Sequence, residues 1–222
     1  MDAFKEKNKI STIKQQVYDI IKENILNGTF EQGEWLQEKK LAEMLDVSRS
    51  PVREALKELV GEGLLENIPN KGVFVRKYSK KDIDNIFELR EILEKYAIKK
   101  IIEESSDIEI GVLINIFNEM EDSYNKGDLL DYYKIDTIFH ATLYYMCENE
   151  ILDHMVSGIL PIIQPTKIGY KQGMARFGKS LEEHRGIVDG IKERNFEKAL
   201  KYQKIHLDLA KEETIKNLEI KD

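Results

Sequence analysis

The stretch from Val47 to Leu59 constrains this chain more than any other part of the sequence, because it places two opposite chemistries on one short helix. Apolar residues recur at helical spacing on one face, namely Val52, Ala55, Leu56, Leu59 and Val60. Cations recur on the other face, namely Arg49, Arg53 and Lys57. Pro51 is tolerated only in the first turn of a helix, so we expect Ser48 or Ser50 to be the N-cap. The basic face therefore lies at the leading end of a helix whose other side packs inward.

The neighbouring segments supply partners for this helix. A short helix is predicted from Leu36 to Leu45, with a tight turn at Asp46–Val47 leading into the basic helix. Two β-rich runs, Leu64–Ile68 and Val73–Arg76, enclose a turn-forming cluster and predict a hairpin. An earlier amphipathic helix is predicted from a stripe of isoleucine and valine, namely Ile13, Val17, Ile20, Ile21 and Ile25. Together these elements predict a winged helix-turn-helix, a fold whose second helix enters the major groove of DNA.

Spaced cations on a helix usually mark a solvated surface, and spacing alone would favour that interpretation. The order of helix, helix, tight turn, helix and hairpin favours DNA binding instead. The expected DNA contacts are Lys39, Lys40, Ser48, Arg49, Ser50, Arg53, Asn70, Lys71 and Gly72. The chain has a formal net charge of −7, all of it in the part after Tyr78. We therefore expect a modest, strongly salt-dependent affinity, set by cations within about 8 Å of the groove.

Composition excludes several classes of protein. A hydrophobic content of 41% and a charged content of 34% are ordinary for a soluble globular protein. The single cysteine, Cys147, permits no intrachain disulfide. The first residues have no apolar core of the kind a signal peptide needs, and no apolar run approaches membrane-spanning length. We therefore expect a cytoplasmic protein without a membrane partner.

A domain boundary is predicted at Tyr78. Ser79 is placed as an N-cap, Asp82 as the third helical residue, and Tyr78 and Ile83 as a hydrophobic staple. We expect a winged helix-turn-helix domain at 1–77 and an all-helical domain at 78–222. Helices are predicted near 80–104, 107–126, 128–147, 149–169, 178–194 and 196–218. The expected fold is mainly α, with a C-terminal antiparallel bundle of about six helices whose core is a natural place for a ligand.

Three of the four histidines fall on inward stripes of three different predicted helices, namely His140, His184 and His206. Asp136 precedes His140 by one helical turn, so these two side chains share a face. We therefore expect all four groups to meet in the bundle core. His154 lies off this pattern and is not included.

A single histidine on an apolar stripe is more often a satisfied core residue than a metal ligand. Three of them with an aspartate, however, each need a polar partner, and one divalent ion satisfies all four. This set of ligands suits Zn²⁺, Ni²⁺ or Mn²⁺. A metalloenzyme that activates water is an alternative use of the same ligands. The sequence offers no convincing general base beside them, so we expect no enzyme.

Arg90 lies in register with apolar residues on its predicted helix, so part of it should face the bundle interior. A buried guanidinium needs an anion. One hypothesis is an ion pair with an interior carboxylate, such as Asp136 or a glutamate on a neighbouring helix. The other is a bidentate fork for the carboxylate of a small organic acid that also reaches the metal.

The segment from Ile25 to Val75 resembles the GntR family of bacterial transcription regulators. The resemblance rests on Ile25–Gly28, Gly33, Leu36, Leu41–Ala42, Ser48–Leu56 and Glu62–Leu64. Gln32 stands where the family usually has proline, and Asp46 stands where it often has glycine. Neither position lies on the predicted DNA face.

The C-terminal part resembles the FCD effector domain of the FadR-type branch of that family. The resemblance rests on Glu88–Glu94, Asp136, Phe139–His140, Glu183–Arg185 and His206. Members of this type bind a divalent metal through one aspartate and three histidines, and the resemblance implies that role for Asp136, His140, His184 and His206. Their effectors are commonly small organic acids. The helix count is similar to that of the six-helix, VanR-like variety.

The sequence therefore predicts a DNA-binding transcriptional regulator, with repression as the expected mode. Its operator binding is expected to be controlled by a small carboxylate effector at a divalent-metal site in the C-terminal bundle. We expect a homodimer on double-stranded operator DNA. A regulator that responds to the metal alone, without an organic effector, is the alternative.

Overall fold

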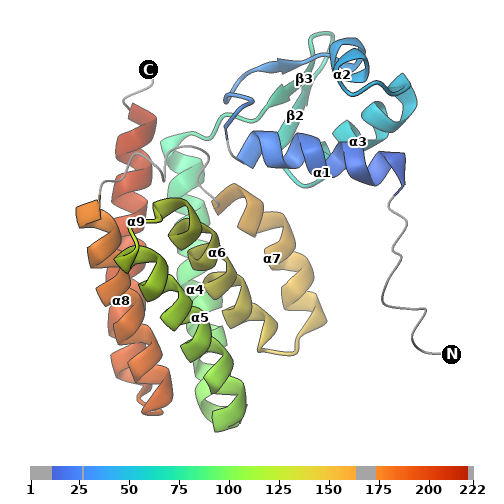
Figure 1. The fold of residues 1–222 in the computed structure, drawn as a ribbon. Coiled ribbons are helices and arrows are strands. Elements are labelled where there is room, and N and C mark those ends of the chain that lie inside the picture. Colours follow the sequence, from blue (N-terminus) through green and yellow to red (C-terminus); the bar gives the residue numbers. More distant parts are fainter. Residues whose placement is uncertain (1–11, 27, 164–173, 220–222) are drawn as a thin grey trace, which may run out of the picture. The chain divides into compact units, whose positions relative to one another are not determined.

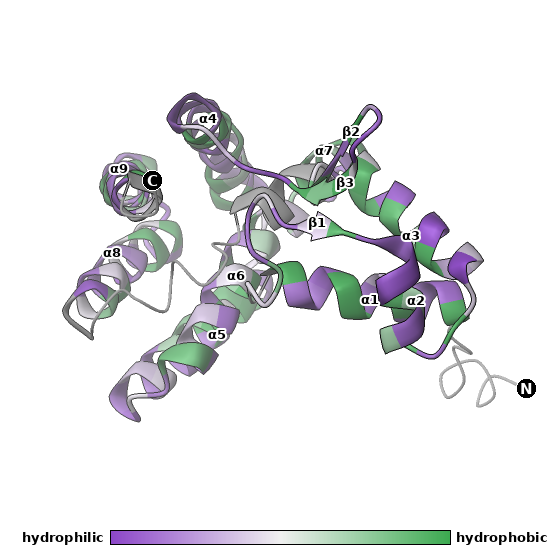
Figure 2. Cartoon of the chain, turned by 90° about the horizontal axis from the view of Figure 1, so that it is seen from above, coloured by the Kyte–Doolittle hydropathy of each residue, from purple (hydrophilic) through white to green (hydrophobic). Residues whose placement is uncertain are grey.

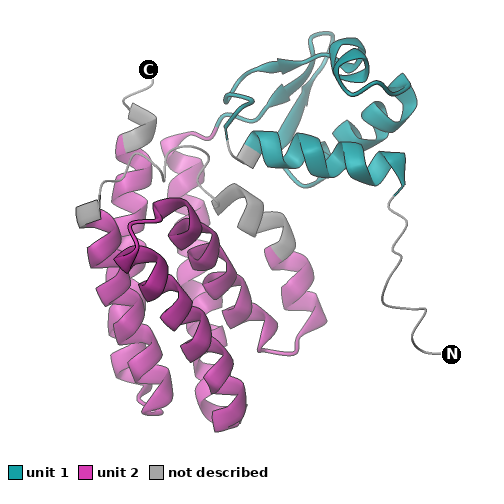
Figure 3. Cartoon of the chain, in the orientation of Figure 1, with its two compact units in different colours: residues 1–77 teal, residues 78–222 magenta. Residues whose placement is uncertain are grey.

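The computed structural model describes residues 12–26, 28–163 and 174–219 (Figure 1). The chain divides into two compact units, residues 1–77 and residues 78–222 (Figure 3). Among the described helices, none is long and apolar enough to cross a membrane.

The first unit combines three helices with a three-stranded antiparallel sheet in the order β1-β3-β2. Its elements are α1 (Ile13–Leu26), β1 (Trp35–Leu36), α2 (Glu38–Met44), α3 (Arg49–Gly61), β2 (Leu65–Ile68) and β3 (Gly72–Val75). The predicted winged helix-turn-helix is confirmed. The predicted start of the second helix at Leu36 is wrong, because Leu36 lies in β1 opposite Val73 and the helix begins at Glu38.

The basic helix has the two faces expected from its sequence. Its apolar stripe is buried, with Val52, Ala55 and Leu59 fully enclosed in the core of this unit. Ser48 is the N-cap residue. The turn from α2 to α3 passes through Asp46, whose φ of 51° lies in the left-handed region that glycine adopts most easily. Asp46 therefore fills a backbone position suited to glycine without displacing α3.

The hairpin between β2 and β3 is fixed against β1. Gly72 has a φ of 109°, and a Cβ at this position would lie 2.7 Å from Trp35 Nε1. Trp35 in turn stacks on Phe74, with ring centroids 6.4 Å apart. This close approach holds the tip of the hairpin, which contains Asn70 and Lys71, in a defined position.

The second unit contains six helices within its described residues. They are α4 (Lys80–Glu104), α5 (Asp107–Asn125), α6 (Leu129–Tyr145), α7 (Glu150–Ile163), α8 (Met174–Lys192) and α9 (Phe196–Glu219). Apolar and polar residues both occur on α4, α5 and α9 (Figure 2). The predicted helical bundle is confirmed, although α8 begins at Met174 rather than at 178. The part of the predicted fourth helix at 164–169 lies outside the described residues.

The capping residues predicted at the start of α4 are present. The Ser79 hydroxyl accepts a hydrogen bond from the Asp82 backbone N–H, and the Asp82 carboxylate accepts one from the Ser79 backbone N–H. Ile83 is buried, with Tyr78 packed against its cluster. Two reciprocal hydrogen bonds therefore fix the first turn of α4.

Helices α8 and α9 approach closely because glycine leaves room at their contact. A Cβ on Gly190 would lie 2.5 Å from the backbone nitrogen of Ala199. A Cβ on Gly186 would lie 2.1 Å from the Tyr202 ring. The two helices carry His184 and His206, so this contact determines how near those two histidines come to one another.

Replacement of Gly190 by alanine tests this contact. We expect Gly190→Ala to lower the free energy of unfolding by roughly 1–3 kcal/mol, because the new methyl group meets backbone that cannot move aside. Gly111→Ala on α5 is the matched control, since its Cβ would meet no atom within 4 Å. The free energy of unfolding of the control should rise by about 0.5–1 kcal/mol, because alanine has a higher helix propensity than glycine. Chemical denaturation measures both, and equal stability of the Gly190 variant and the parent would contradict the close packing.

Candidate metal centre and DNA-binding face

Four potential ligands converge in the core of the second unit, as the sequence predicts. Asp136 and His140 come from α6, His184 from α8 and His206 from α9, and one ligand atom from each lies within 4.8 Å of the others. The three histidines are buried and Asp136 is partly exposed. His140 Nε2 lies 3.1 Å from His206 Nε2 and 3.3 Å from His184 Nε2. His184 Nε2 also lies 3.3 Å from Asp136 Oδ1.

Each of the three rings turns its other nitrogen, Nδ1, toward an oxygen. His184 Nδ1 lies 2.7 Å from the backbone oxygen of Ser180. His206 Nδ1 lies 3.0 Å from Glu183 Oε2, and His140 Nδ1 faces Glu94 Oε1 at 3.3 Å. A carbonyl or carboxylate oxygen only accepts hydrogen bonds, so the contacts of His184 and His206 favour the hydrogen of each ring on Nδ1. His140 Nδ1 faces Glu94 without a hydrogen bond of good geometry, and the same tautomer would direct its hydrogen toward that carboxylate.

With this tautomer, the space between the three Nε2 atoms and Asp136 contains hydrogen-bond acceptors but no donor. With hydrogen on Nδ1, each Nε2 presents a lone pair, and these lone pairs point at one another and at the Asp136 carboxylate. Lone pairs at such distances repel unless a cation lies among them. Two nitrogen ligands bound to one ion at about 2.1 Å are themselves about 3.0–3.4 Å apart at octahedral or tetrahedral angles. The spacing and the tautomers of this cluster therefore fit a divalent metal ion.

Burial keeps two of the rings, His184 and His206, neutral. Burial lowers the pKa of His184 to about 4, an effect that Asp136 opposes only in part. Burial, together with the neighbouring rings of His184 and His140, lowers the pKa of His206 well below its usual value. Near pH 7 both rings are therefore uncharged, which is the form that binds a metal.

Two arginine–glutamate pairs support the centre. Arg90 is buried, and its Nη2 lies 2.9 Å from Glu94 Oε1. Arg176 Nη1 lies 3.0 Å from Glu183 Oε1. Burial alone would raise the pKa of Glu94, but Arg90 and His140 hold it at about 2. The same two glutamates face histidine ligands, so each links an arginine to a ring.

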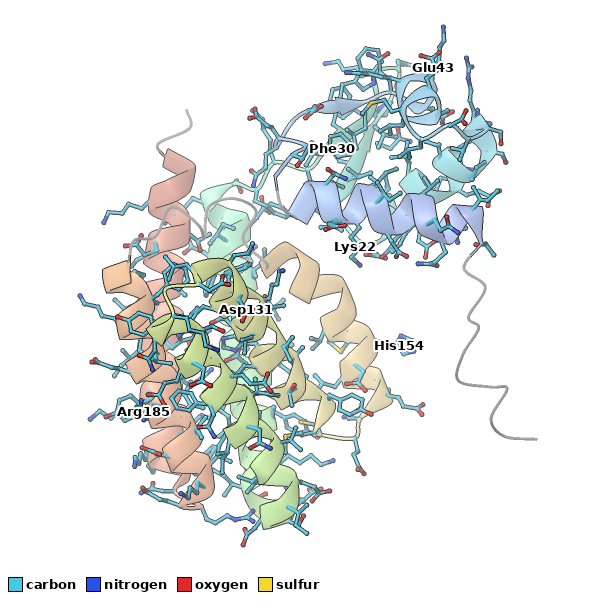
Figure 4. All side chains as sticks on the ribbon, in the orientation of Figure 1. Lys22, Phe30, Glu43, Asp131, His154 and Arg185 are labelled. Atoms are coloured by element: carbon cyan, nitrogen blue, oxygen red, sulfur yellow. The ribbon has the colours of Figure 1, made fainter. Side chains whose placement is uncertain are left out.

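The predicted burial of Arg90 is confirmed, and its partner is a residue that the sequence did not single out. Glu94 lies one turn further along the same helix, whereas the ion-pair hypothesis considered Asp136 or a neighbouring helix. The roles of Glu94, Glu183 and Ser180 beside the histidines were also missed. For Ser180 a local pattern existed, because its carbonyl precedes His184 by one helical turn. His154, labelled in Figure 4, lies exposed on α7 and is not one of the four convergent residues.

All the predicted DNA contacts are at least partly exposed to solvent. Gly72 is partly exposed, and the exposed contacts lie on α2, on α3, at the N-cap of α3 and in the hairpin turn. They are Lys39, Lys40, Ser48, Arg49, Ser50, Arg53, Asn70 and Lys71. Arg49 lies in the first turn of α3 and Arg53 in the second. Exposed cations at the start of this helix can reach phosphates and base edges.

Comparison with known proteins identifies the class. The model of the bacterial regulatory proteins of the gntR family matches residues 13–75, and the model of the FCD domain matches residues 85–209. The chain therefore belongs to the GntR family of transcriptional regulators and carries an FCD domain. These are families of regulators rather than enzymes, as expected from the sequence.

Relatives of similar sequence agree with this assignment, and solved structures share the fold. The chain is 31% identical to the HTH-type transcriptional regulator YdhC of Bacillus subtilis over 94% of this chain and 93% of that one. It is 26% identical to the gluconate operon transcriptional repressor of the same species, over 90% of this chain and 82% of that one. Escherichia coli McbR/YncC has the same fold, with a TM-score of 0.76 and 23% identity over 90% of this chain and 95% of that one. A putative transcriptional regulator from Rhodococcus sp. RHA1 also has this fold, with a TM-score of 0.77 and 24% identity over 91% of this chain and 97% of that one.

The outer contacts of the histidines generate a prediction. Glu183→Gln removes the charged acceptor of His206 Nδ1, and loss of such a partner typically weakens metal affinity about 10- to 100-fold. Glu182→Gln is the matched control, because its side chain is the exposed neighbour on the same helix. Competition with a chromogenic zinc chelator measures both affinities. Equal affinities for the two variants would show that Glu183 does not support the ligand.

Proposed function

We propose that this chain is a transcriptional repressor whose binding to operator DNA is controlled by a small carboxylate effector at a divalent-metal site. The proposed ligands are Asp136, His140, His184 and His206, and the proposed metals are Zn²⁺, Ni²⁺ or Mn²⁺. The proposed DNA-reading surface is the exposed side of α2, α3 and the hairpin turn. Repression is proposed because a relative is a repressor of the gluconate operon.

One observation carries the metal part of this proposal. Three imidazole Nε2 atoms and a carboxylate converge, while each Nδ1 faces an oxygen acceptor. A core that needed only satisfied histidines would pair a donor with each acceptor. The convergence of acceptors alone is instead what a cation requires.

Charge balance supports an anionic effector. Three carboxylates, from Asp136, Glu94 and Glu183, and two guanidinium groups, from Arg90 and Arg176, lie in or beside the centre. With all of them ionised, these five groups have a net charge of −1. A bound divalent ion would change that net charge to +1. A buried positive charge favours binding of an anion, and a small carboxylate supplies one.

Arg90 is the proposed anchor for the effector carboxylate. It is buried close enough to the centre to interact electrostatically with both Asp136 and His206. Its planar fork matches a carboxylate in geometry. The Arg90–Glu94 ion pair favours the alternative, a regulator that responds to metal alone, since Arg90 then already has its anion.

We also propose that the chain acts as a homodimer on a palindromic operator. One winged helix-turn-helix reads one half-site, and two copies related by twofold symmetry read two half-sites spaced by one helical turn of DNA. Effector binding would shift the balance between two arrangements of the winged domains only if it favours one of them. Analytical ultracentrifugation of the whole chain, with and without operator, tests the assembly.

Elemental analysis tests the metal site. Protein purified without chelator should carry about one divalent ion per chain, because the cluster is a single four-ligand site. His184→Ala should lose the ion, since His184 Nε2 faces both His140 and Asp136. His154→Ala is the control and should retain it. Absence of bound metal from the parent, even after reloading the chelated protein, would return these histidines to a structural role.

Thermal-shift screening of zinc-loaded protein against small mono- and dicarboxylic acids identifies the effector, because a ligand of the folded state raises the melting temperature. Arg90→Lys keeps a cation beside Glu94 but loses the bidentate fork. The effector concentration for a half-maximal response should then rise about 10- to 100-fold, while metal content stays near that of the parent. Arg185→Lys, at an exposed arginine labelled in Figure 4, is the control. An unchanged effector response in Arg90→Lys would favour regulation by metal alone.

A further inference from the structure

Two arginines stand on the exposed side of α3, and they are held differently. Arg53 Nε lies 3.1 Å from both carboxylate oxygens of Glu38, and Arg53 Nη2 lies 2.9 Å from Glu38 Oε2. Within the described part of the chain, Arg49 makes no side-chain hydrogen bond or ion pair. One arginine of the DNA-binding face is therefore fixed in direction before DNA arrives, and the other is not.

The contact with Glu38 occupies one particular edge of the guanidinium group. Arginine has five N–H donors, and Glu38 takes those on the side formed by Nε and Nη2. The end of the group, formed by Nη1 and the second hydrogen of Nη2, stays available. Arginine reads guanine with two parallel hydrogen bonds to O6 and N7. The free end of Arg53 can make that pair without releasing Glu38.

Glu38 differs from Glu43, the other glutamate within α2 that forms an ion pair, because its partner lies on α3 rather than on the same helix. It sits in the first turn of α2, where the positive end of the helix dipole stabilises its carboxylate. It reaches across from α2 to α3 to make its ion pair, and its side chain is 34% exposed. A carboxylate on a surface that approaches phosphates lowers affinity for every DNA sequence. Because Glu38 lowers affinity for DNA of any sequence, we expect it to contribute to discrimination between DNA sequences.

We propose that Glu38 is a positioning residue for DNA recognition, which clamps one edge of the Arg53 guanidinium so that its free end reads a guanine. This inference rests on the DNA-reading surface proposed above. An exposed arginine without a partner samples many rotamers and can satisfy a phosphate as readily as a base. The clamp removes most of that freedom, so Arg53 contributes selectivity rather than general attraction. Arg49 keeps its freedom and can adapt to either kind of contact.

The test needs a DNA probe that the protein chooses itself. The parent chain is first used to select its preferred site from a random-sequence duplex library. Affinity is then measured for the selected duplex, for single-base variants of it, and for a scrambled duplex of the same length. The ratio of selected to scrambled affinity reports specificity, and the scrambled affinity reports general attraction. Failure of the parent to select any site would contradict the proposed function itself, before Glu38 is tested.

Glu38→Gln is the central variant, because glutamine has the same size but only one acceptor oxygen and no charge. We expect the specificity ratio to fall about tenfold, with affinity for the scrambled duplex equal to or above that of the parent. The loss should concentrate at the base pair whose preference Arg53→Ala relaxes, where that arginine is expected to contribute roughly 5- to 150-fold discrimination. Glu38→Gln combined with Arg53→Ala should discriminate no worse than Arg53→Ala alone.

Glu43→Gln is the matched control. Glu43, labelled in Figure 4, is also an exposed carboxylate on α2, and its ion pair is with Lys39 on the same helix rather than with α3. The control removes the same charge, so it can raise general affinity, but it should leave preference at the Arg53 base pair unchanged. A loss of discrimination in Glu38→Gln but not in Glu43→Gln isolates the clamp from the effect of charge.

Four outcomes would overturn the proposal. A specificity ratio in Glu38→Gln within twofold of the parent would show that Arg53 needs no clamp. Tighter binding to the selected duplex, with discrimination retained, would show that Glu38 competes with DNA for Arg53. A changed preference at a base pair that Arg53→Ala does not affect would show that Glu38 reads DNA directly. A parallel loss of selected and scrambled affinity, with a lower melting temperature, would show a purely structural role.

Discussion

Burial of ionisable groups away from water is the constraint on which the C-terminal bundle depends. The histidines of the candidate centre enter the core with an oxygen facing each Nδ1, and two of those oxygens belong to Glu94 and Glu183. An unpaired carboxylate there would cost several kcal/mol, so each glutamate needs a cation of its own. Arg90 and Arg176 supply these cations. The rings of His140 and His206 are therefore oriented by glutamates that are themselves paired with arginines, whereas the ring of His184 is oriented by the backbone oxygen of Ser180.

Sequence periodicity predicted which residues enter this core but not what meets them there. The face that a residue occupies depends only on its position along a helix, and His140, His184 and His206 are all buried as predicted. The partner of His206 Nδ1 depends instead on how α8 and α9 pack, which no single-helix pattern contains. Glu183 is therefore visible only in the folded structure. The Arg90–Glu94 pair is local, but a glutamate is rarely buried, so its sequence position alone does not predict that Glu94 enters the core.

The fold was predictable where a segment is long and amphipathic, and it was not where packing overrides a local preference. Trp35 and Leu36 form a two-residue strand because β3 offers them backbone partners, although their own sequence carries no strand pattern. The sequence predicts a helix that begins at Gly178, yet Gly178 lies inside α8, where a Cβ would lie 2.7 Å from the Tyr124 hydroxyl. In both cases a neighbouring element decides the local structure, and propensity is only a weak guide.

Arginine–glutamate pairs occur in both units, with opposite energetic consequences. The Arg53–Glu38 pair is exposed, so water can solvate both charges and the ion pair itself contributes little free energy. A contact between Arg53 and DNA therefore requires little free energy from the rest of the domain. The Arg90–Glu94 pair is buried, and separating it would leave two uncompensated charges. An effector carboxylate can take Arg90 only if Glu94 keeps a cation nearby, and Glu94 already faces His140, a proposed metal ligand. Positive charge held at the centre is therefore a condition for releasing Arg90. Arg53 needs no such condition, because it can offer its other edge to DNA while it keeps its contact with Glu38.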